Sequence, residues 1–303
     1  MTARVPGGSL ALYCGGPAFG AWNATRASFP LTTIDPAMPR TVIISDTHLA
    51  NPSSAVRSPA MLRPLWQGAN ELIVNGDAAE LHHPTHRERA IELTVELQSL
   101  CEHDGVRLTL IAGNHDPFIS DVRYLLLADG RVFVTHGDVL HPAIAPWSEN
   151  ADHLRREMRW ALSRMSPEER GRLEARLAAA QHASHMEWTT HVHNPPRTSL
   201  VKLAMRPMTV AKLLHYWWRV PELADTFMRE HAPQASFMVL GHTHRQGIWR
   251  RGDRVVVNTG SFGFPARPRA IVLEDDQLAV HAIVRQRQAY SLAPRPVAAF
   301  SLR

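Results

Sequence analysis

The sequence predicts an α/β fold in which covered β-strands end in polar loops. Runs of apolar, β-prone residues recur in the first half of the chain and again near its end, and they lack the alternation of a strand with one exposed face. A helical pattern separates the second run from the third, and the order strand, helix, strand is typical of α/β layering. At 303 residues, the chain can form one large domain that carries an insertion.

Four strands and one helix are predicted in the first half of the chain. The helix spans about Pro84–His103, where apolar residues recur at helical spacing, and Gly105 follows in the position of a C-terminal cap. The strands, each a short apolar run, are Thr41–Ser45, Glu71–Asn75, Arg107–Ile111 and Arg131–Thr135.

Helical signals then dominate over about residues 141–235. Ser166 begins a helix, because serine is a preferred N-cap and is followed here by a proline and, three residues on, by Glu169. A second helix is predicted over Thr209–Val220, and Pro221 is expected to open a third. No convincing strand pattern interrupts this stretch.

Strands return after the helical stretch. They are Ser236–Leu240, Arg254–Asn258 and a hairpin of Ala270–Leu273 with Leu278–Val284 around Asp275 and Asp276. We therefore interpret the chain as an N-terminal extension of residues 1–40 followed by one domain of residues 41–303, which the helical insertion at about residues 141–235 interrupts.

Five polar motifs stand just past the carboxyl ends of predicted strands, which is where open α/β sheets place their ligands. Each contains Asp, Asn or His, whose oxygens and ring nitrogens bind divalent metals. A lone Asp-x-His or Gly-Asp favours an ordinary loop, whereas five such motifs in order indicate a site. The motifs are Asp46-Thr47-His48, Gly76-Asp77, Gly113-Asn114-His115-Asp116, His136-Gly137-Asp138 and Gly241-His242-Thr243-His244.

Seven side chains of these motifs are candidate metal ligands, enough for two divalent ions with positions left for water and substrate. Oxygen and imidazole ligands without cysteine suit manganese, with iron or zinc as alternatives. Two such ions about 3.5–4 Å apart can assist the attack of water on a phosphate ester. The candidate ligands are Asp46, His48, Asp77, Asn114, His136, His242 and His244.

The set of motifs resembles the pattern of the calcineurin-like metallophosphoesterase superfamily over about residues 41–140 and 236–285. The resemblance implies a two-sheet β-sandwich flanked by helices, with a dimetal site at the strand ends. It implies a catalytic role for His115 at the substrate phosphate or the leaving group, with Asp116 accepting the other ring proton of His115. It also implies that Asp46, His48 and His244 hold one ion, that Asn114, His136 and His242 hold the other, and that Asp77 bridges them.

Finer details resemble the UDP-2,3-diacylglucosamine hydrolase branch of that superfamily. These are Leu49 after the first motif, Glu80 after the second and Leu140 after His-Gly-Asp. Enzymes of that branch cleave a lipid-linked pyrophosphate and carry a helical lid after the His-Gly-Asp motif. The chain differs in having His115 where typical members have arginine. Lipid-linked and nucleotide substrates are therefore both options.

The insertion carries the basic character of the chain. Residues 151–219 hold twelve Lys or Arg and six Asp or Glu, a local balance of +6 against +5 for the whole chain. Basic residues beside Trp160, Trp217 and Trp218 suit an anionic lipid surface or a substrate with phosphate and acyl parts. A solvated Arg-rich face over an apolar core fits the same pattern. Single-stranded nucleic acid is a third option, but no recognition motif for it is present.

A third metal site is conceivable late in the insertion, where four histidines cluster. No acidic or cysteine partner stands at ligand spacing, so we interpret them as surface histidines. They are His182, His185, His191 and His193. Asp152 and His153 are similarly interpreted as helix-start residues rather than ligands.

We expect a dimetal-dependent phosphohydrolase that cleaves a phosphoester or pyrophosphate bond of a small-molecule or lipid substrate by metal-activated hydroxide. The alternatives are a metal-binding scaffold of the same fold and a phosphodiesterase acting on nucleotides or nucleic acid. Two cysteines, Cys14 and Cys101, form no disulfide framework or zinc knuckle by their spacing, which favours a reducing compartment. A cytoplasmic location is therefore expected, with peripheral contact to an anionic membrane as a further option.

Overall fold

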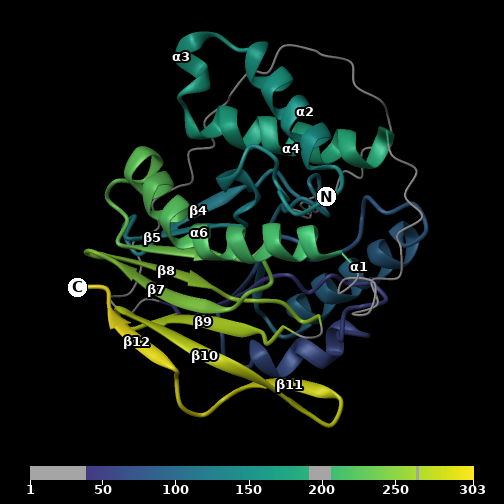
Figure 1. Ribbon diagram of the computed structural model, residues 1–303. Coiled ribbons are helices and arrows are strands. Elements are labelled where there is room, and N and C mark those ends of the chain that lie inside the picture. Colours follow the sequence, from purple (N-terminus) through teal and green to yellow (C-terminus); the bar gives the residue numbers. More distant parts are fainter. Residues whose placement is uncertain (1–38, 191–205, 264–265) are drawn as a thin grey trace, which may run out of the picture. The chain divides into compact units, whose positions relative to one another are not determined.

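The computed structural model describes residues 39–190, 206–263 and 266–303, which are coloured in Figure 1. In chain order its elements are β1 (Thr41–Ile44), η1 (Pro59–Leu65), β2 (Glu71–Asn75), α1 (Arg87–His103), β3 (Arg107–Ile111), β4 (Tyr124–Leu127), β5 (Val132–Thr135), η2 (Asp138–Leu140), α2 (Ala151–Ser163), α3 (Pro167–Arg170), α4 (Leu173–Thr190), α6 (Pro207–His231), β6 (Phe237–Leu240), β7 (Gly247–Arg251), β8 (Arg254–Asn258), β9 (Arg269–Glu274), β10 (Gln277–Gln286), β11 (Ala289–Leu292) and β12 (Ala298–Ser301). The expected N-terminal extension lies outside the described residues except for its last two.

The strands form two sheets. Sheet one has seven strands in the order β11-β10-β9-β1-β2-β3, with β12 also paired to β10, and sheet two has five in the order β4-β5-β6-β8-β7. β1, β2 and β3 are parallel neighbours, and so are β5, β6 and β8. Parallel neighbours end at a common edge of a sheet, so the polar loops that follow them gather there.

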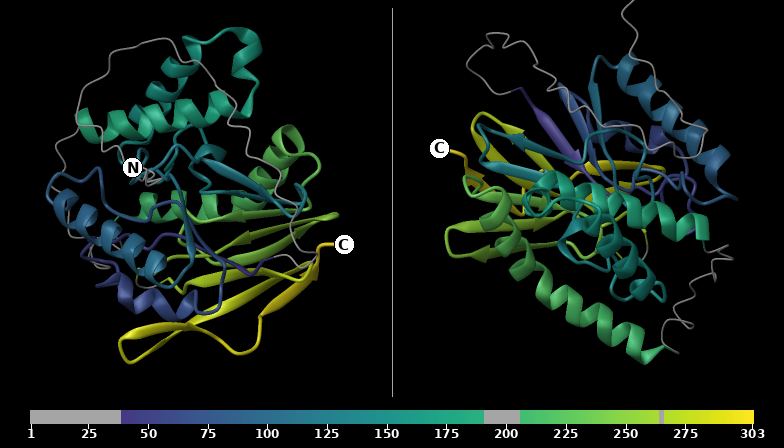
Figure 2. Two further views of the ribbon diagram at one scale, coloured as in Figure 1. Left: turned by 180° about the vertical axis from the view of Figure 1, so that it is seen from behind. Right: turned by 90° about the horizontal axis from the view of Figure 1, so that it is seen from above.

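Apolar side chains fill three layers around the two sheets. Figures 1 and 2 show the strands and helices from three sides. α1 and η1 cover the outer face of sheet one, and α2, α4 and α6 cover that of sheet two. Successive side chains of a strand point to opposite faces. Val42 and Ile44 of β1 therefore face the α1 layer, while Ile43 lies between the sheets. This double burial explains the continuous apolar runs, and the predicted two-sheet α/β architecture with flanking helices is confirmed.

The predicted elements of the scaffold are present within one to three residues at their ends. α1 begins at Arg87 rather than Pro84, and Gly105 follows its end with a left-handed φ of 69°. The capping box at Ser166 is present, with its hydroxyl accepting from the Glu169 backbone N–H and the Glu169 carboxylate accepting from the Ser166 backbone N–H. The last hairpin is longer than expected, since β9 and β10 extend to residues 269–274 and 277–286.

The expectation that Pro221 opens a new helix is wrong, because α6 runs unbroken through it. A proline inside a helix removes one N–H and deprives the carbonyl four residues earlier of its partner. That carbonyl belongs to Trp217, and the Arg245 guanidinium donates to it at 3.1 Å. A side chain from the loop after β6 therefore replaces the missing helical bond, and Pro221 itself is buried.

Four strands were not expected from the sequence: β4, β7, β11 and β12. β4 and β7 are the two edges of sheet two, β11 is an edge of sheet one, and β12 pairs with β10 alone. Their side chains are mostly half-buried or exposed, so they lack the continuous apolar pattern of the central strands. Among the described residues, no helix is long and apolar enough to span a membrane.

Candidate metal centre

Loops after β1, β2, β3, β5 and β6 bring the seven predicted ligands together. Donor atoms of six of the seven form two groups, and within each group the atoms lie within 4.8 Å of one another; a third such group joins His48 to Glu80 and His115. The carboxylate of Asp77 belongs to both groups. The first group is Asp46, His48, Asp77 and His244, and the second is Asp77, His136 and His242.

The first group lies between the loops after β1 and β6. His48 Nε2 is 3.0 Å from His244 Nε2, and His244 Nε2 is 3.2 Å from Asp46 Oδ1. His48 Nε2 also lies 3.8 Å from Asp77 Oδ2. Asp46 and Asp77 are fully buried, whereas the His244 side chain is 44% exposed. Buried carboxylates facing imidazole nitrogens are the donor set of a divalent cation site.

The second group adds an amide oxygen. His136 Nε2 is 3.2 Å from Asp77 Oδ2 and 3.3 Å from Asn114 Oδ1. His242 Nδ1 is 2.8 Å from the same amide oxygen. The second ring nitrogens face backbone carbonyls, His136 Nδ1 that of Asn75 and His242 Nε2 that of Ile144, each at 3.0 Å. Such contacts set the orientation and tautomer of a metal-binding imidazole.

Five of the seven predicted ligands have a left-handed backbone, which is rare for residues other than glycine. Their φ values are 51° at Asp46, 45° at His48, 50° at Asp77, 65° at His242 and 57° at His244. Such conformations cost of order 1–3 kcal/mol each and collect at functional sites. Each of these residues lies in a loop that follows β1, β2 or β6, and their side chains converge in the two donor groups.

Two glycines leave the room that the carboxylates occupy. A Cβ at Gly113 would overlap Asp77 Oδ1, and a Cβ at Gly241 would overlap Asp46 Oδ2. The close backbone approach explains why these motifs carry glycine. The carboxylates are thus held in a cradle that any larger residue would fill, and the converging oxygen and nitrogen donors fit divalent metal ions.

The charges in the cluster shift the pKa values of their neighbours. Burial opposes the charge on Asp77, but His136, His115 and His48 outweigh it and hold the pKa of this carboxyl well below its usual range. Burial likewise opposes the charge on His136, but Asp77 and Asp46 raise its pKa to about 10. Burial and the neighbouring His136 lower the pKa of His242 to about 4. Without metal, the cluster therefore balances its carboxylates with protonated imidazole, and metal binding releases those protons.

Glu80 is the main site residue that the sequence motifs did not single out as functional. It is 2% exposed, its Oε1 lies 2.8 Å from His48 Nδ1, and its Oε2 lies 3.0 Å from His115 Nδ1. Asn51 Nδ2 donates to Oε1 at 2.7 Å. One carboxylate therefore orients a predicted ligand and the predicted catalytic histidine together. Its spacing after Asp77 was the signal available in the sequence.

The prediction that Asp116 orients His115 is wrong. The buried Asp116 carboxylate instead accepts from four backbone N–H groups, those of Asp77, Ala78, Ala79 and Gly113, at 2.6–3.2 Å. Burial and the adjacent Asp77 raise the pKa of Asp116 to about 6. Asp116 therefore shapes the loops that carry Asp77 and Asn114, and the contact with His115 Nδ1 belongs to Glu80.

Replacing Asp116 by alanine is expected to lower the free energy of unfolding by about 3 kcal/mol or more, because a buried donor without a partner costs about 1–3 kcal/mol. Urea unfolding followed by circular dichroism measures this. Asp121→Ala is the matched control, since Asp121 is an exposed aspartate of the same loop region. Equal stability of the two variants would show that the four contacts of Asp116 contribute little.

Aromatic side chains of the insertion reach the cluster, as expected of a helical segment that follows His136 and lies over the metal site. The Trp188 ring of α4 packs edge-on against His115 with centroids 5.7 Å apart. The Trp147 ring packs against His242 with centroids 5.5 Å apart. Trp217 Nε1 of α6 donates to the backbone carbonyl of Thr243 at 3.0 Å. The insertion therefore forms part of the wall around the cluster.

The histidines late in the insertion do not assemble a further metal group among the described residues. His185 Nδ1 lies 3.2 Å from His82 Nε2, and His182 Nε2 lies 3.3 Å from Glu157 Oε2. His191 and His193 lie outside the described residues. Asp152 stands in the first turn of α2, as expected of a helix-start residue.

Two layered sheets with a cluster of oxygen and imidazole donors at the strand ends define a metallophosphoesterase fold. Residues 39–246 match the calcineurin-like phosphoesterase family, and the chain belongs to that family. The family and the clusters together indicate that the protein binds divalent metal ions. A comparison with curated protein sequences finds no match.

Solved structures similar to the chain share little sequence with it. A dimetal phosphatase from Danio rerio has a TM-score of 0.43 and 13% identity, covering 84% of this chain and 99% of that one. A predicted phosphoesterase from Streptococcus pneumoniae has a TM-score of 0.41 and 13% identity, covering 87% and 97%. Vps29 from Entamoeba histolytica, complexed with Zn²⁺, has a TM-score of 0.40 and 11% identity, covering 87% and 99%. At such scores, these likenesses bear on neither substrate nor activity.

Proposed function

We propose that the protein is a dimetal-dependent phosphohydrolase acting on a phosphoester or pyrophosphate bond. The observation that carries the proposal is the sharing of the Asp77 carboxylate between two groups of donor atoms. In the proposed centre, one ion is held by Asp46, His48 and His244, the other by Asn114, His136 and His242, and both by Asp77. Manganese is the proposed metal, with iron or zinc as alternatives that the same donors accept.

His115 is the proposed catalytic side chain. Its Nδ1 faces Glu80, so Nε2 is the ring atom directed toward the cluster, 4.0 Å from Asp77 Oδ2. Two bound divalent ions supply charge neutralisation at a phosphate and lower the pKa of water. Glu80 holds the proton on His115 Nδ1, and His115 Nε2 contacts the phosphate or donates a proton to the leaving oxygen. The His115 side chain is 28% exposed, which leaves it open to a substrate.

A turnover screen tests the proposed function. Purified protein with manganese added is expected to hydrolyse at least one ester in a panel of phosphate monoesters, diesters and pyrophosphates, and chelation is expected to abolish that activity. A metal-binding scaffold is the rival function, and it predicts bound metal without turnover on any member of the panel. The panel includes nucleotide and nucleic acid diesters, so it also tests the phosphodiesterase alternative.

The substrate is proposed to reach the metal centre past the insertion. Trp188 and Trp147 lie against His115 and His242, so α4 and the loop before α2 would contact the group attached to the phosphate. A lipid-linked pyrophosphate, as in the UDP-2,3-diacylglucosamine hydrolase branch, is one proposed class, and a nucleotide pyrophosphate is the other. We also propose that the protein is located in the cytoplasm.

Peripheral contact with an anionic membrane is proposed for α6. Met208, Leu214 and Trp218 are 70%, 54% and 69% exposed, and the same helix carries the cationic Lys212 and Arg219. Apolar side chains beside cationic ones on an exposed helix suit a membrane interface. Deleting the insertion would not isolate this contact, because its helices share a buried core with sheet two.

Liposome co-sedimentation measures this contact. Vesicles containing phosphatidylglycerol are expected to bind the protein at low salt, and added salt is expected to weaken the binding because screening shortens the reach of the cationic groups. The double variant Leu214→Ser with Trp218→Ser is expected to lose most of the binding. Trp160→Ser is the matched control, because Trp160 is 47% exposed on α2. Equal binding by both variants would exclude α6 as the contact.

A further inference from the structure

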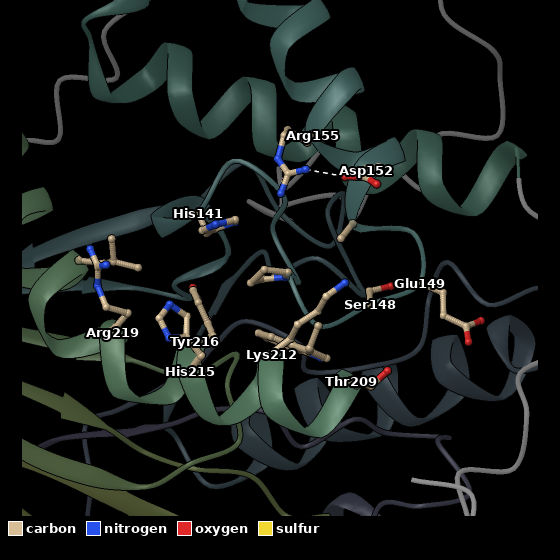
Figure 3. A pocket seen from close by; sticks show the side chains of 14 residues that line it. His141, Ser148, Glu149, Asp152, Arg155, Thr209, Lys212, His215, Tyr216 and Arg219 are labelled. Carbon is tan, nitrogen blue, oxygen red and sulfur yellow. Dashed lines mark hydrogen bonds and ion pairs between the residues drawn. The ribbon is translucent and has the colours of Figure 1, made fainter. Parts of the chain in front are cut away.

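A cavity of about 510 Å³ lies between the first turns of α2, the loop before it and the N-terminal half of α6 (Figure 3). Its volume falls within the range of roughly 300–1,000 Å³ that is typical of small-molecule sites. None of the seven predicted metal ligands lines it. It is therefore a compartment separate from the metal centre.

Cationic side chains enter the cavity from both sides. Figure 3 shows Arg155 reaching into it from α2, and Lys212 reaching in from α6 on the opposite side. Arg219 lines the cavity seven residues further along α6, and its Nε is 3.0 Å from Glu222 Oε2. Lys212 forms no ion pair with any carboxylate among the described residues. A solvated cation without a partner in a hollow favours an anionic ligand.

Neither of the two carboxylates at the cavity pairs with Lys212. Asp152 pairs with Arg155, and Glu149 pairs with Arg206 outside the lining. Figure 3 shows the Glu149 carboxylate pointing away from the cavity. With both acidic groups engaged, Lys212 remains available as a cationic group for a ligand.

Tyr216 adds a buried polar group to the cavity lining. Its side chain lines the cavity, it is only 3% exposed, and its hydroxyl has no hydrogen-bond partner among the described residues. A buried hydroxyl without a partner costs about 1–3 kcal/mol, so native proteins rarely retain one unless a ligand or water satisfies it. Figure 3 shows the hydroxyl end of Tyr216 pointing toward His141.

Aromatic rings form the remaining wall. The Trp147 and Tyr216 rings lie with centroids 5.2 Å apart, and His141 packs edge-on against Tyr216 at 5.7 Å. Trp147 also packs against His242, so one indole separates the cavity from the metal cluster. A pocket with cations, one buried donor and flat apolar walls suits a molecule that carries an anionic group on a ring-shaped body.

We propose that this cavity binds a phosphorylated organic molecule of nucleotide or sugar-phosphate size. The phosphate contacts Lys212, Arg155 and the Tyr216 hydroxyl, and the organic body lies against Trp147. A phosphate alone would leave most of the volume and the aromatic wall without contacts. The site does not depend on hydrolysis at the metal centre, so it can be tested with that centre disabled.

Isothermal titration calorimetry in the presence of EDTA tests the proposal, because chelation removes the metals that could hold a phosphate elsewhere. The probes are AMP, UMP, glucose 6-phosphate and inorganic phosphate. At least one organic probe is expected to bind with a Kd of about 1 mM or tighter, and inorganic phosphate is expected to bind at least about tenfold more weakly. Tyr216→Phe and Lys212→Gln are each expected to raise the Kd of the organic probe about tenfold, since each removes one contact to a charged group.

Matched controls separate binding from folding. Arg156→Gln changes an exposed arginine of α2 outside the lining and is expected to leave the Kd unchanged. Tyr216→Phe is expected to leave the melting temperature unchanged or raised, because it removes a hydroxyl without a partner. Three outcomes would overturn the proposal: no organic probe binding at 10 mM, inorganic phosphate binding as tightly as the organic probes, or equal binding by wild type, Tyr216→Phe and Lys212→Gln.

Discussion

Replacing Asp77 by alanine is expected to release both metal ions and to lower turnover about 1,000-fold or more, which corresponds to about 4 kcal/mol of barrier. Asp77 is the carboxylate shared by both donor groups, so its loss leaves each ion with fewer ligands and exposes their mutual repulsion. Elemental analysis of the purified variant measures the metal, and a generic chromogenic phosphodiester measures turnover. Asp77→Asn keeps the shape but not the charge and is expected to lose at least one ion.

Asp121→Ala is a suitable control for this prediction, because Asp121 is exposed and outside the donor groups. It should retain metal and activity at the wild-type level. Wild-type metal content in Asp77→Ala would exclude Asp77 as the bridge. Circular dichroism would detect unfolding of Asp77→Ala. If that variant unfolds, the metal content of Asp77→Asn is used to test the bridging role of Asp77.

Removing the imidazole of His115 is expected to leave the metals in place while turnover falls roughly 10²–10⁴-fold, the range for a lost acid–base group. His115 belongs to neither donor group that shares Asp77, so His115→Ala should not open either one. The loss is expected in kcat, because the proposed contact strengthens as the leaving oxygen gains charge. Metal content and steady-state kinetics on one substrate measure both effects.

Glu80→Gln distinguishes positioning from catalysis at the same histidine. Glu80 contacts His48 and His115 through separate oxygens, so the amide can serve only one of them as acceptor. We expect a smaller loss than for His115→Ala, about 10–100-fold, with weaker metal binding as well. His103→Ala, at the exposed end of α1, is the histidine control. For the His115→Ala variant described above, loss of metal in proportion to the loss of activity would show that His115 is a metal ligand.

The sequence by itself determined the central scaffold and the position of its polar loops. Burial on both faces demands apolar residues at every position of a strand such as Val42–Ile44, and that demand is visible without coordinates. The motifs that follow these strands can also be read from short stretches of sequence, although Gly113 and Gly241 make room for the carboxylates of Asp77 and Asp46, which come from other parts of the chain. The edge strands carry no such demand, which is why β4 and β7 were missed.

Only the tertiary structure decided which side chain serves which partner. Asp116 follows His115 in sequence, yet its carboxylate turns back onto four backbone N–H groups, and Glu80, thirty-five residues away, reaches His115 instead. Pro221 ended a helix by local rules, but Arg245 satisfies the carbonyl that the proline leaves open. In each case the deciding partner lies far along the chain. Hydrogen bonds of buried groups depend on distance in space, and no spacing in the sequence specifies it.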